Sequence, residues 1–198
     1  MLRAHRTHLI TGILAGSAIA ATAAAALTIW IIKTLPPPTL IEGRQVAQST
    51  KLYDRTGSVL LYEIYGEQRR TVVPFAEIPD VVKWSTVAIE DANFYTHQAL
   101  DWKSIVRALL TNLAHGRVLQ GGSTITQQLA KKAFLSDERT IARKLKELVL
   151  SIELERRFSK DEILASYLNQ IPYGGSAYGV EAASQLFFQK SVRDVTIA

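Results

Sequence analysis

The chain has 198 residues, 47% of them hydrophobic, which suits one domain with an appendage. It contains no cysteine, so disulfide bonds, thiol catalysis and cysteine-ligated metal sites are excluded. A formal net charge of +5 favours an anionic partner, such as nucleic acid, an anionic bilayer surface or a phosphorylated substrate.

An uncharged and mostly apolar run extends from Leu9 to Ile32. A helix of about 20 such residues spans the hydrocarbon core of a bilayer. Arg3 and Arg6 precede the run, and positive charge marks the cytoplasmic side of a membrane segment. We therefore predict a cytoplasmic tail and single-pass anchor in residues 1–34, with the remainder of the chain outside the membrane. A cleaved signal peptide is the alternative, and the length of the run favours a retained helix.

Residues 35–78 are predicted to form a proline-rich spacer and a β-hairpin region. Three consecutive prolines from Pro36 make a stiff, extended segment. Two β-prone stretches, 51–53 and 58–62, flank a turn sequence that begins at Asp54 and ends at Gly57, which predicts a hairpin. Residues 70–73 are a candidate third strand.

Residues 79–198 are predicted to form a helical domain. Asp101, Ser136 and two capping-box pairs, Thr124 with Gln127 and Ser159 with Glu162, indicate helix N-termini. The apolar spacing from Trp102 to Leu113 is i, i+3, i+4, i+7, as in an amphipathic helix. Helices are expected over residues 81–91, 102–115, 124 onward, 137–157, 160–170 and 180–188, with a turn at 173–175.

Two adjacent acids, Glu90 and Asp91, follow the apolar run 87–89. An acid at the end of a buried run next to a like charge is a candidate general base. A solvated helix end is the alternative, and the spacing alone favours this simpler interpretation.

The segment from Gly121 to Lys131 is more polar than a packed helix requires. Its two glycines let the backbone approach a ligand, and a helix N-terminus with hydroxyl groups suits an anion. A capped helix after a loop would explain the glycines and threonines, but not Gln127-Gln128 together with Lys131.

Glu147 lies four residues after Arg143 and three after Lys144, so each of the two cations shares a helix face with it. A surface ion pair is the simple interpretation. However, further cations crowd the region, and such a cluster suits a bound pyrophosphate; they are Lys131, Lys132, Arg139 and Lys146.

These three segments, in this order, resemble the peptidoglycan glycosyltransferase family, the transglycosylase domains of bifunctional penicillin-binding proteins and of monofunctional enzymes. The family's Glu-Asp-x-x-Phe-x-x-His signature falls on residues 90–97, its second signature matches 121–131, and Arg-Lys-x-x-Glu falls on 143–147. Two further signatures fall on 160–169 and 179–183. The resemblance implies a mainly α-helical, lysozyme-like glycosyltransferase fold, with a cleft between a larger lobe and a smaller, membrane-proximal one. It also implies that the domain is incomplete at its C-terminus.

By this resemblance the protein polymerises lipid II into β-1,4-linked glycan strands, by inverting transfer with release of the lipid pyrophosphate. It would act on the periplasmic or extracellular face of the bacterial plasma membrane. Glu90 would be the catalytic base, and Glu147 would orient the sugar or the cations, or help hold a divalent metal ion, Mg²⁺ or Mn²⁺. The residues implied to bind substrate are Asp91, Ser123, Thr124, Gln127, Gln128, Lys131, Arg139, Arg143, Lys144 and Asn169.

Two other functions are weighed against this one. A lytic enzyme of the same fold has no use for a cationic leaving-group site. An inactive, anchored scaffold would not need both Glu90 and Glu147. The expected partners are lipid II, the growing glycan strand and the bilayer, and self-association or a cell-wall synthesis complex is left open. No aromatic-interleaved basic motif indicates nucleic acid, and the four histidines are too scattered to indicate a metal site.

Overall fold

The structure, a computed structural model, describes residues 15–19, 21–22, 25–26, 28–30, 33–35, 46–117, 121–136, 138 and 140–197. The chain divides into two compact units, Met1–Pro36 and Pro37–Ala198, each considered by itself. In the first unit, the described residues up to 34 are helical. Among all residues described, no helix combines the length and the apolar character needed to cross a bilayer. Much of the predicted anchor, and the proline spacer, lie outside the described residues, so both stay predictions.

The predicted hairpin is confirmed. Strands β1 (Thr50–Tyr53) and β2 (Leu60–Ile64) pair antiparallel. The Asp54 carboxylate accepts the backbone N–H groups of Ser58 and Val59, which closes the turn.

The predicted third strand is displaced and joins another sheet. Strand β3 (Arg69–Arg70) pairs in parallel with β5 (Ala177–Tyr178), which pairs antiparallel with β4 (Pro172–Gly174). The expected turn at 173–175 therefore lies within a small three-stranded sheet. Such a pairing across more than 100 residues is set by tertiary packing, which local sequence does not reveal.

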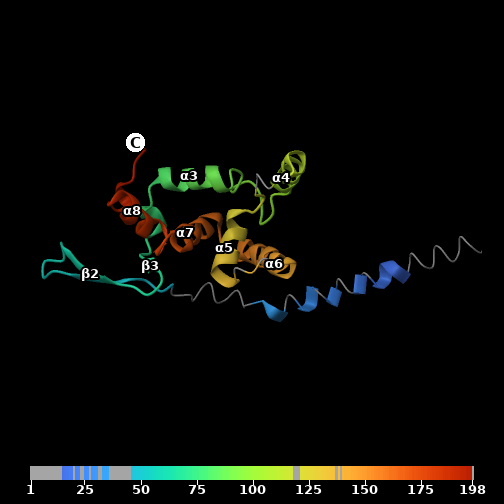
Figure 1. The fold of residues 1–198 in the computed structure, drawn as a ribbon, viewed down its shortest axis with the longest axis horizontal. Coiled ribbons are helices and arrows are strands. Elements are labelled where there is room, and N and C mark those ends of the chain that lie inside the picture. Colours follow the sequence, from blue (N-terminus) through green and yellow to red (C-terminus); the bar gives the residue numbers. More distant parts are fainter. Residues whose placement is uncertain are drawn as a thin grey trace, which may run out of the picture. The chain divides into compact units, whose positions relative to one another are not determined.

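The helices follow the predicted order (Figure 1). They are α3 (Asp80–Glu90), α4 (Trp102–His115), α5 (Ile125–Phe134), α6 (Ile141–Arg157), α7 (Lys160–Gln170) and α8 (Val180–Phe188), with 3-10 turns at Phe75–Glu77 and Val192–Asp194. Asp101, Thr124 and Ser159 cap their helices as predicted, each accepting a backbone N–H three residues ahead. Helix α6 begins later than predicted, because Thr140 rather than Ser136 is its N-cap. Both hydroxyls can cap a helix, so the sequence did not decide between them.

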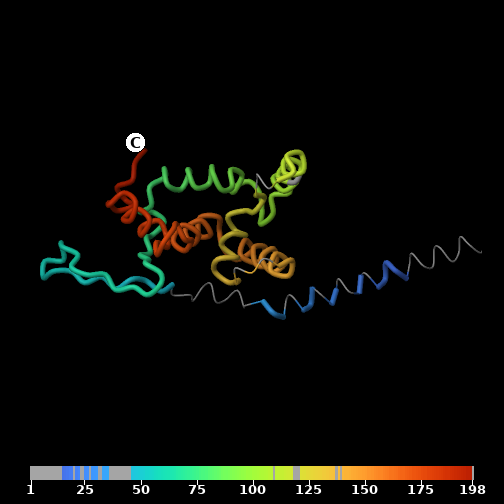
Figure 2. Tube along the Cα trace, in the orientation of Figure 1, coloured from blue at the N-terminus to red at the C-terminus, as the bar shows by residue number. Residues whose placement is uncertain are grey.

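The core is built around α5 and α7. Helix α5 packs against both α6 and α7, and Figure 2 shows its trace running between them. Helix α7 buries neighbouring residues of one face, and each such side chain contributes about 1.5–3 kcal/mol. The buried cluster comprises Val73, Ile78, Val87, Phe94, Ile125, Leu129, Ile163, Leu164, Tyr167, Leu168, Val180 and Val192.

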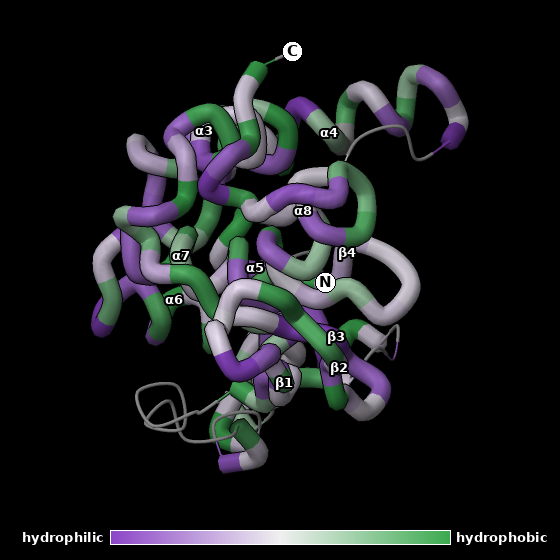
Figure 3. Tube along the Cα trace, turned by 90° about the vertical axis from the view of Figure 1, so that its left-hand side faces the viewer, coloured by the Kyte–Doolittle hydropathy of each residue, from purple (hydrophilic) through white to green (hydrophobic). Residues whose placement is uncertain are grey.

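Helix α4 is loosely packed by comparison. Among its described side chains Ala108 is buried, whereas Trp102, Val106, Leu110 and Leu113 are exposed. In Figure 3, α4 projects from the other helices of its unit. Gly116 ends the helix with φ 62°, as predicted.

Helix α8 ends at Gln189, which has φ 55°. All other positive-φ residues in the described part of the chain are glycines. A side chain in this left-handed conformation costs about 1–2 kcal/mol, offset in part by the entropy that glycine loses on folding. We expect Gln189→Gly to raise the free energy of unfolding by about 1 kcal/mol, or Tm by about 2–4 °C. Denaturation measurements should show the opposite sign for Gln185→Gly, within the same helix, and a loss of stability at position 189 would contradict the prediction.

Candidate active site

Three chain segments meet at the candidate site. They are the C-terminus of α3 with the loop that follows, the N-terminus of α5 with its preceding glycine loop, and the first two turns of α6. The structure thus brings together the three segments that the sequence analysis singled out. The contact between α5 and α6 places the second and third segments side by side.

Glu90 is the last residue of α3, and its side chain is exposed. Gln128 Nε2 donates a hydrogen bond to Glu90 Oε2 at 2.9 Å. One carboxylate oxygen is therefore held by α5, and the side chain lies at the edge of a cavity. This is the geometry that a general base requires: an accessible carboxylate with a fixed orientation.

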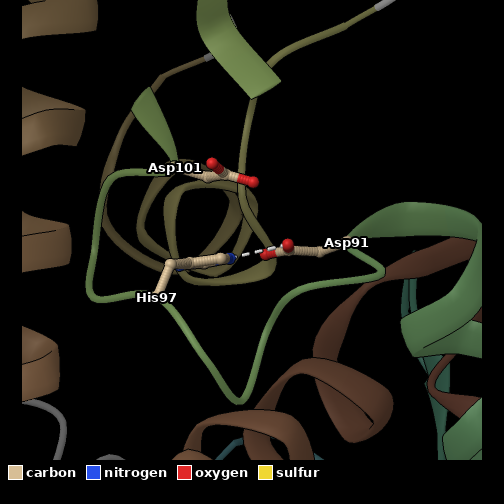
Figure 4. A group of neighbouring side chains, drawn as sticks. All are labelled: Asp91, His97 and Asp101. Atoms are coloured by element: carbon tan, nitrogen blue, oxygen red, sulfur yellow. Dashed lines mark hydrogen bonds and ion pairs between the residues drawn. The ribbon is translucent and has the colours of Figure 1, made fainter. Parts of the chain in front are cut away.

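Asp91, the next residue, is buried and makes its contacts within the protein. Its Oδ1 lies 2.7 Å from His97 Nε2, and its Oδ2 accepts the backbone N–H of Ile125 at 3.1 Å (Figure 4). Asp91 therefore connects the loop after α3 to the N-terminus of α5. It lines the cavity beside Glu90, but its two oxygens already accept hydrogen bonds, so positioning this loop accounts for its contacts better than binding substrate does.

His97 and two aspartates form a cluster that the sequence analysis missed when it judged the histidines too scattered. Candidate ligand atoms of Asp91, His97 and Asp101 lie within 4.8 Å of one another. His97 Nδ1 contacts the carbonyl oxygen of Gln98, and Ser104 donates both its N–H and its hydroxyl to Asp101. These bonds from Ser104 lower the pKa of Asp101 to about 2, against the opposing effect of burial. The hydrogen bonds already account for the cluster without a metal ion.

The hydroxyl and amide groups at the start of α5 divide into buried and accessible ones. Thr124 Oγ1 and Gln127 Nε2 both donate to the carbonyl oxygen of Ala99, at 3.1 and 3.2 Å, and both side chains are buried. They hold the loop before α4 against α5. Ser123 and Gln128 remain partly accessible and line cavities.

A cluster of charges joins α6 to α5. Glu147 is 3% exposed, and its two oxygens accept from Arg143, at 2.7 Å, and from Lys144. Lys144 Nζ also donates to Ser123 Oγ at 3.0 Å and to Gln127 Oε1 at 3.1 Å. Glu147 thus fixes two cations, and one of them, Lys144, is also held by Ser123 and Gln127.

Two cavities share Ser123 as a common wall. The first, of about 370 Å³, is here called the Glu90 cavity. Its other lining residues include the acidic Asp91 and Asp101 and the cationic Arg107. The second, of about 300 Å³, is the cationic cavity. It is lined by Ser123, Gln128, Lys131, Lys132, Arg143, Lys144 and Glu147. With four cationic side chains against one carboxylate, it suits an anion such as a phosphate group.

Arg139 and Asn169 are the two remaining predicted substrate-binding residues. Arg139 lies outside the described residues. Asn169 is buried, where its amide accepts the N–H of Val73 at 2.8 Å and donates to the carbonyl oxygens of Val73 and Ala165. It is absent from the described walls of both cavities, and its contacts hold α7 to the chain before α3.

Arg107 and Tyr167 also reach the site, and the sequence analysis did not single them out. Arg107 lines the Glu90 cavity from α4. Tyr167, on α7, makes a hydrogen bond with Gln128, which lies 39 residues earlier in the sequence. Both lie within predicted helices, 102–115 and 160–170, where no local pattern distinguishes such a residue from its neighbours.

The chain is similar to a family model and to several known proteins. The family model described as Transglycosylase matches residues 57–198. The chain is 48% identical, over 84% of its length, to penicillin-binding protein 1A of Aquifex aeolicus (strain VF5), covering 23% of that protein. It is 43% identical, over 94% of its length, to penicillin-binding protein 1A of Clostridium perfringens (strain 13 / Type A), covering 28%. The chain thus spans about a quarter of the length of these curated relatives.

The matched region covers most of the chain and contains Glu90, the glycine loop and the cationic cavity. The mainly helical domain with a small sheet is consistent with this match. The chain belongs to the transglycosylase family.

Proposed function

We propose that this domain is a peptidoglycan glycosyltransferase that polymerises lipid II into β-1,4-linked glycan strands. The observation that supports it best is the pairing of an accessible carboxylate, Glu90, with a neighbouring cationic cavity, bridged by Gln128. A glycosyl donor that carries a lipid pyrophosphate needs both features. The base activates the acceptor hydroxyl, and the cations receive the leaving group.

In the proposed reaction the acceptor's 4-hydroxyl attacks C1 of the donor sugar, and Glu90 takes the hydroxyl proton. The C1–O bond to the pyrophosphate breaks, and inversion at C1 converts the α linkage to β-1,4. The pyrophosphate leaves as an anion, so no general acid has to protonate it. Lys131, Arg143 and Lys144 would stabilise its negative charge in the cationic cavity.

Glu147 is better suited to orient cations than to bind a metal ion. Both of its oxygens accept hydrogen bonds from cationic side chains, and it is buried. A divalent metal ion would have to displace Arg143 or Lys144 from this carboxylate, so the residues present do not fit the Mg²⁺ or Mn²⁺ that the resemblance left open. We therefore assign Glu147 the positioning of Arg143 and Lys144.

The lytic alternative is less well supported. Cleavage of a glycan requires a carboxylic acid that protonates a sugar leaving group. A cavity with four cations and one buried carboxylate serves an anionic leaving group instead. An inactive scaffold would not explain why the carboxylate of Glu90 is accessible and held in one orientation by Gln128.

We also propose that the domain works at the membrane surface. The exposed residues Trp102, Val106, Leu110 and Leu113 fall within one arc of α4, and no acidic residue occurs between positions 102 and 117. Lys103 and Arg107 both lie on one side of this arc, and cations beside an apolar arc are typical of helices at anionic lipid surfaces. The predicted anchor at residues 9–32 would hold the domain at the same surface, on the outer face of the plasma membrane.

This membrane contact can be tested with single-tryptophan variants reconstituted in anionic vesicles. In Trp30→Phe/Trp84→Phe, brominated lipids should quench Trp102, and iodide in the buffer should not, because the indole would lie among acyl chains. In the comparison variant Trp30→Phe/Trp102→Phe, Trp84 of α3 should show weaker quenching by brominated lipid. Quenching of Trp102 by iodide alone would contradict the proposal.

The function itself is tested by incubating the detergent-solubilised chain with fluorescent lipid II. A ladder of glycan products on a gel, digested by lysozyme, is the expected result. A folded protein that yields no ladder would overturn the proposed activity for this chain.

A further inference from the structure

Two hydrogen bonds in series link the buried core to the carboxylate of Glu90. Tyr167 Oη donates to Gln128 Oε1 at 3.1 Å, and Gln128 Nε2 donates to Glu90 Oε2 at 2.9 Å. The three residues come from α7, α5 and α3. Tyr167 is 2% exposed and belongs to the core cluster, so the series runs from the buried core of the domain to an accessible side chain.

The direction of the series follows from its donors and acceptors. Burial, and after it the negative charge of Glu90, raises the pKa of Tyr167 above its ordinary value. The phenol therefore keeps its proton at neutral pH and can donate it. An amide has one accepting and one donating end. Since its oxygen accepts from Tyr167, its NH₂ group faces Glu90.

The opposite orientation of the amide is unfavourable. It would place the carbonyl oxygen of Gln128 against the carboxylate of Glu90, two acceptors with no hydrogen between them. A phenol can accept as well as donate, so the carboxylate of Glu90 fixes the orientation of the amide. Tyr167 donates to the amide oxygen that this orientation presents, and so holds Gln128 in place. A phenylalanine at position 167 would fill nearly the same space without making this hydrogen bond.

We propose that Tyr167 is a positioning residue for the catalytic base, which acts through Gln128 to orient and stabilise the ionised carboxylate of Glu90. The inference rests on the proposed function for the role of Glu90. A hydrogen bond to the charged form of a carboxyl group favours that form, and a base must be charged to accept a proton. Gln128 holds one oxygen of Glu90, and Glu90 lines the cavity in which the acceptor hydroxyl would lie.

Other titratable or charged groups surround this series and remain in place when Tyr167 is changed. Tyr173 of β4 is close enough that burial, Tyr167 and Glu90, in this order, raise its pKa. Asp91 is held by His97 and Ile125. The remaining groups line the two cavities and are Asp101, Arg107, Lys131, Lys132, Arg143, Lys144 and Glu147.

The test compares Tyr167→Phe with Tyr95→Phe in the full chain. Tyr95 is a matched control, because its phenol also donates to α7, to Asp161 Oδ1 at 2.9 Å, without touching Gln128. Glutamate carboxyl groups are labelled with ¹³C, and the signal of Glu90 is the one lost in Glu90→Gln. We expect the carboxyl chemical shift of this signal at neutral pH to change in Tyr167→Phe and to stay unchanged in Tyr95→Phe, because it reports on the hydrogen bond that Gln128 donates to Glu90.

Kinetics provide the second measurement. In Tyr167→Phe, kcat for polymer formation should fall about 5–10-fold with KM nearly unchanged, because orientation of the base affects the reaction rather than binding. Gln128→Met, which removes the donor itself, should also change the chemical shift of the Glu90 signal, and it replaces Tyr167→Phe if that variant does not fold. An unchanged signal in the folded variant overturns the inference. If the wild-type chain makes no polymer, the proposed function fails, while the carboxyl signal, which needs no turnover, still decides the role of Tyr167.

Discussion

Glu90→Gln is expected to reduce polymer formation by about 10²–10⁴-fold, the range that general-base catalysis contributes. The substituted amide cannot take the proton of the acceptor hydroxyl. The fold should be unaffected, because the side chain is exposed and nearly isosteric with its replacement. The new amide oxygen can still accept the hydrogen bond from Gln128, so the loss would report on chemistry rather than on packing.

The measurement is the rate of glycan formation from fluorescent lipid II, beside circular dichroism spectra of both proteins. Glu77→Gln is the control, since Glu77 is also an exposed glutamate and pairs with Arg193 rather than with a group at the cavities. It should retain the wild-type rate. A Glu90→Gln protein with more than about a tenth of the wild-type rate would exclude Glu90 as the general base.

Arg143→Ala is expected to weaken binding of a lipid pyrophosphate by about 10–100-fold, the equivalent of one hydrogen bond between charged groups. Arg143 lines the cationic cavity, and its Nη1 donates to the buried Glu147 at 2.7 Å. Lys144 still pairs with Glu147 in the variant. Stability should therefore fall less than affinity does.

Calorimetric titration with a lipid pyrophosphate would measure this affinity. Arg157→Ala is the matched control, because Arg157 lies on the same helix and makes the same kind of i, i+4 pair, with Glu153 at 2.7 Å. Arg157 lies near the other end of α6, and the affinity of the Arg157→Ala protein for the ligand should equal that of the wild type. An unchanged affinity in Arg143→Ala would remove the cationic cavity from the proposed leaving-group site.

Local sequence patterns were sufficient for most of the secondary structure. Capping residues such as Asp101, Thr124 and Ser159 marked helix starts. The side-chain oxygen of such a residue accepts a hydrogen bond from the free backbone N–H three residues later in the sequence, so the signal is local. The prediction was wrong where two sites competed or where pairing was distant. Ser136 and Thr140 could both cap α6, and the partner of β3 lies in β5, more than 100 residues away.

The sequence by itself determined the family, the order of the helices and the identity of the charged groups at the site, since these depend on residue type and short spacing. Only the tertiary structure decided how those groups divide their roles. It shows that Asp91, Thr124 and Gln127 bind other parts of the chain, that Glu147 is enclosed by Arg143 and Lys144, and that Tyr167 reaches Glu90 through Gln128. Burial and long-range hydrogen bonds assign these roles, and both arise from the packing of α5 against α6 and α7, which the periodicity of each helix does not specify.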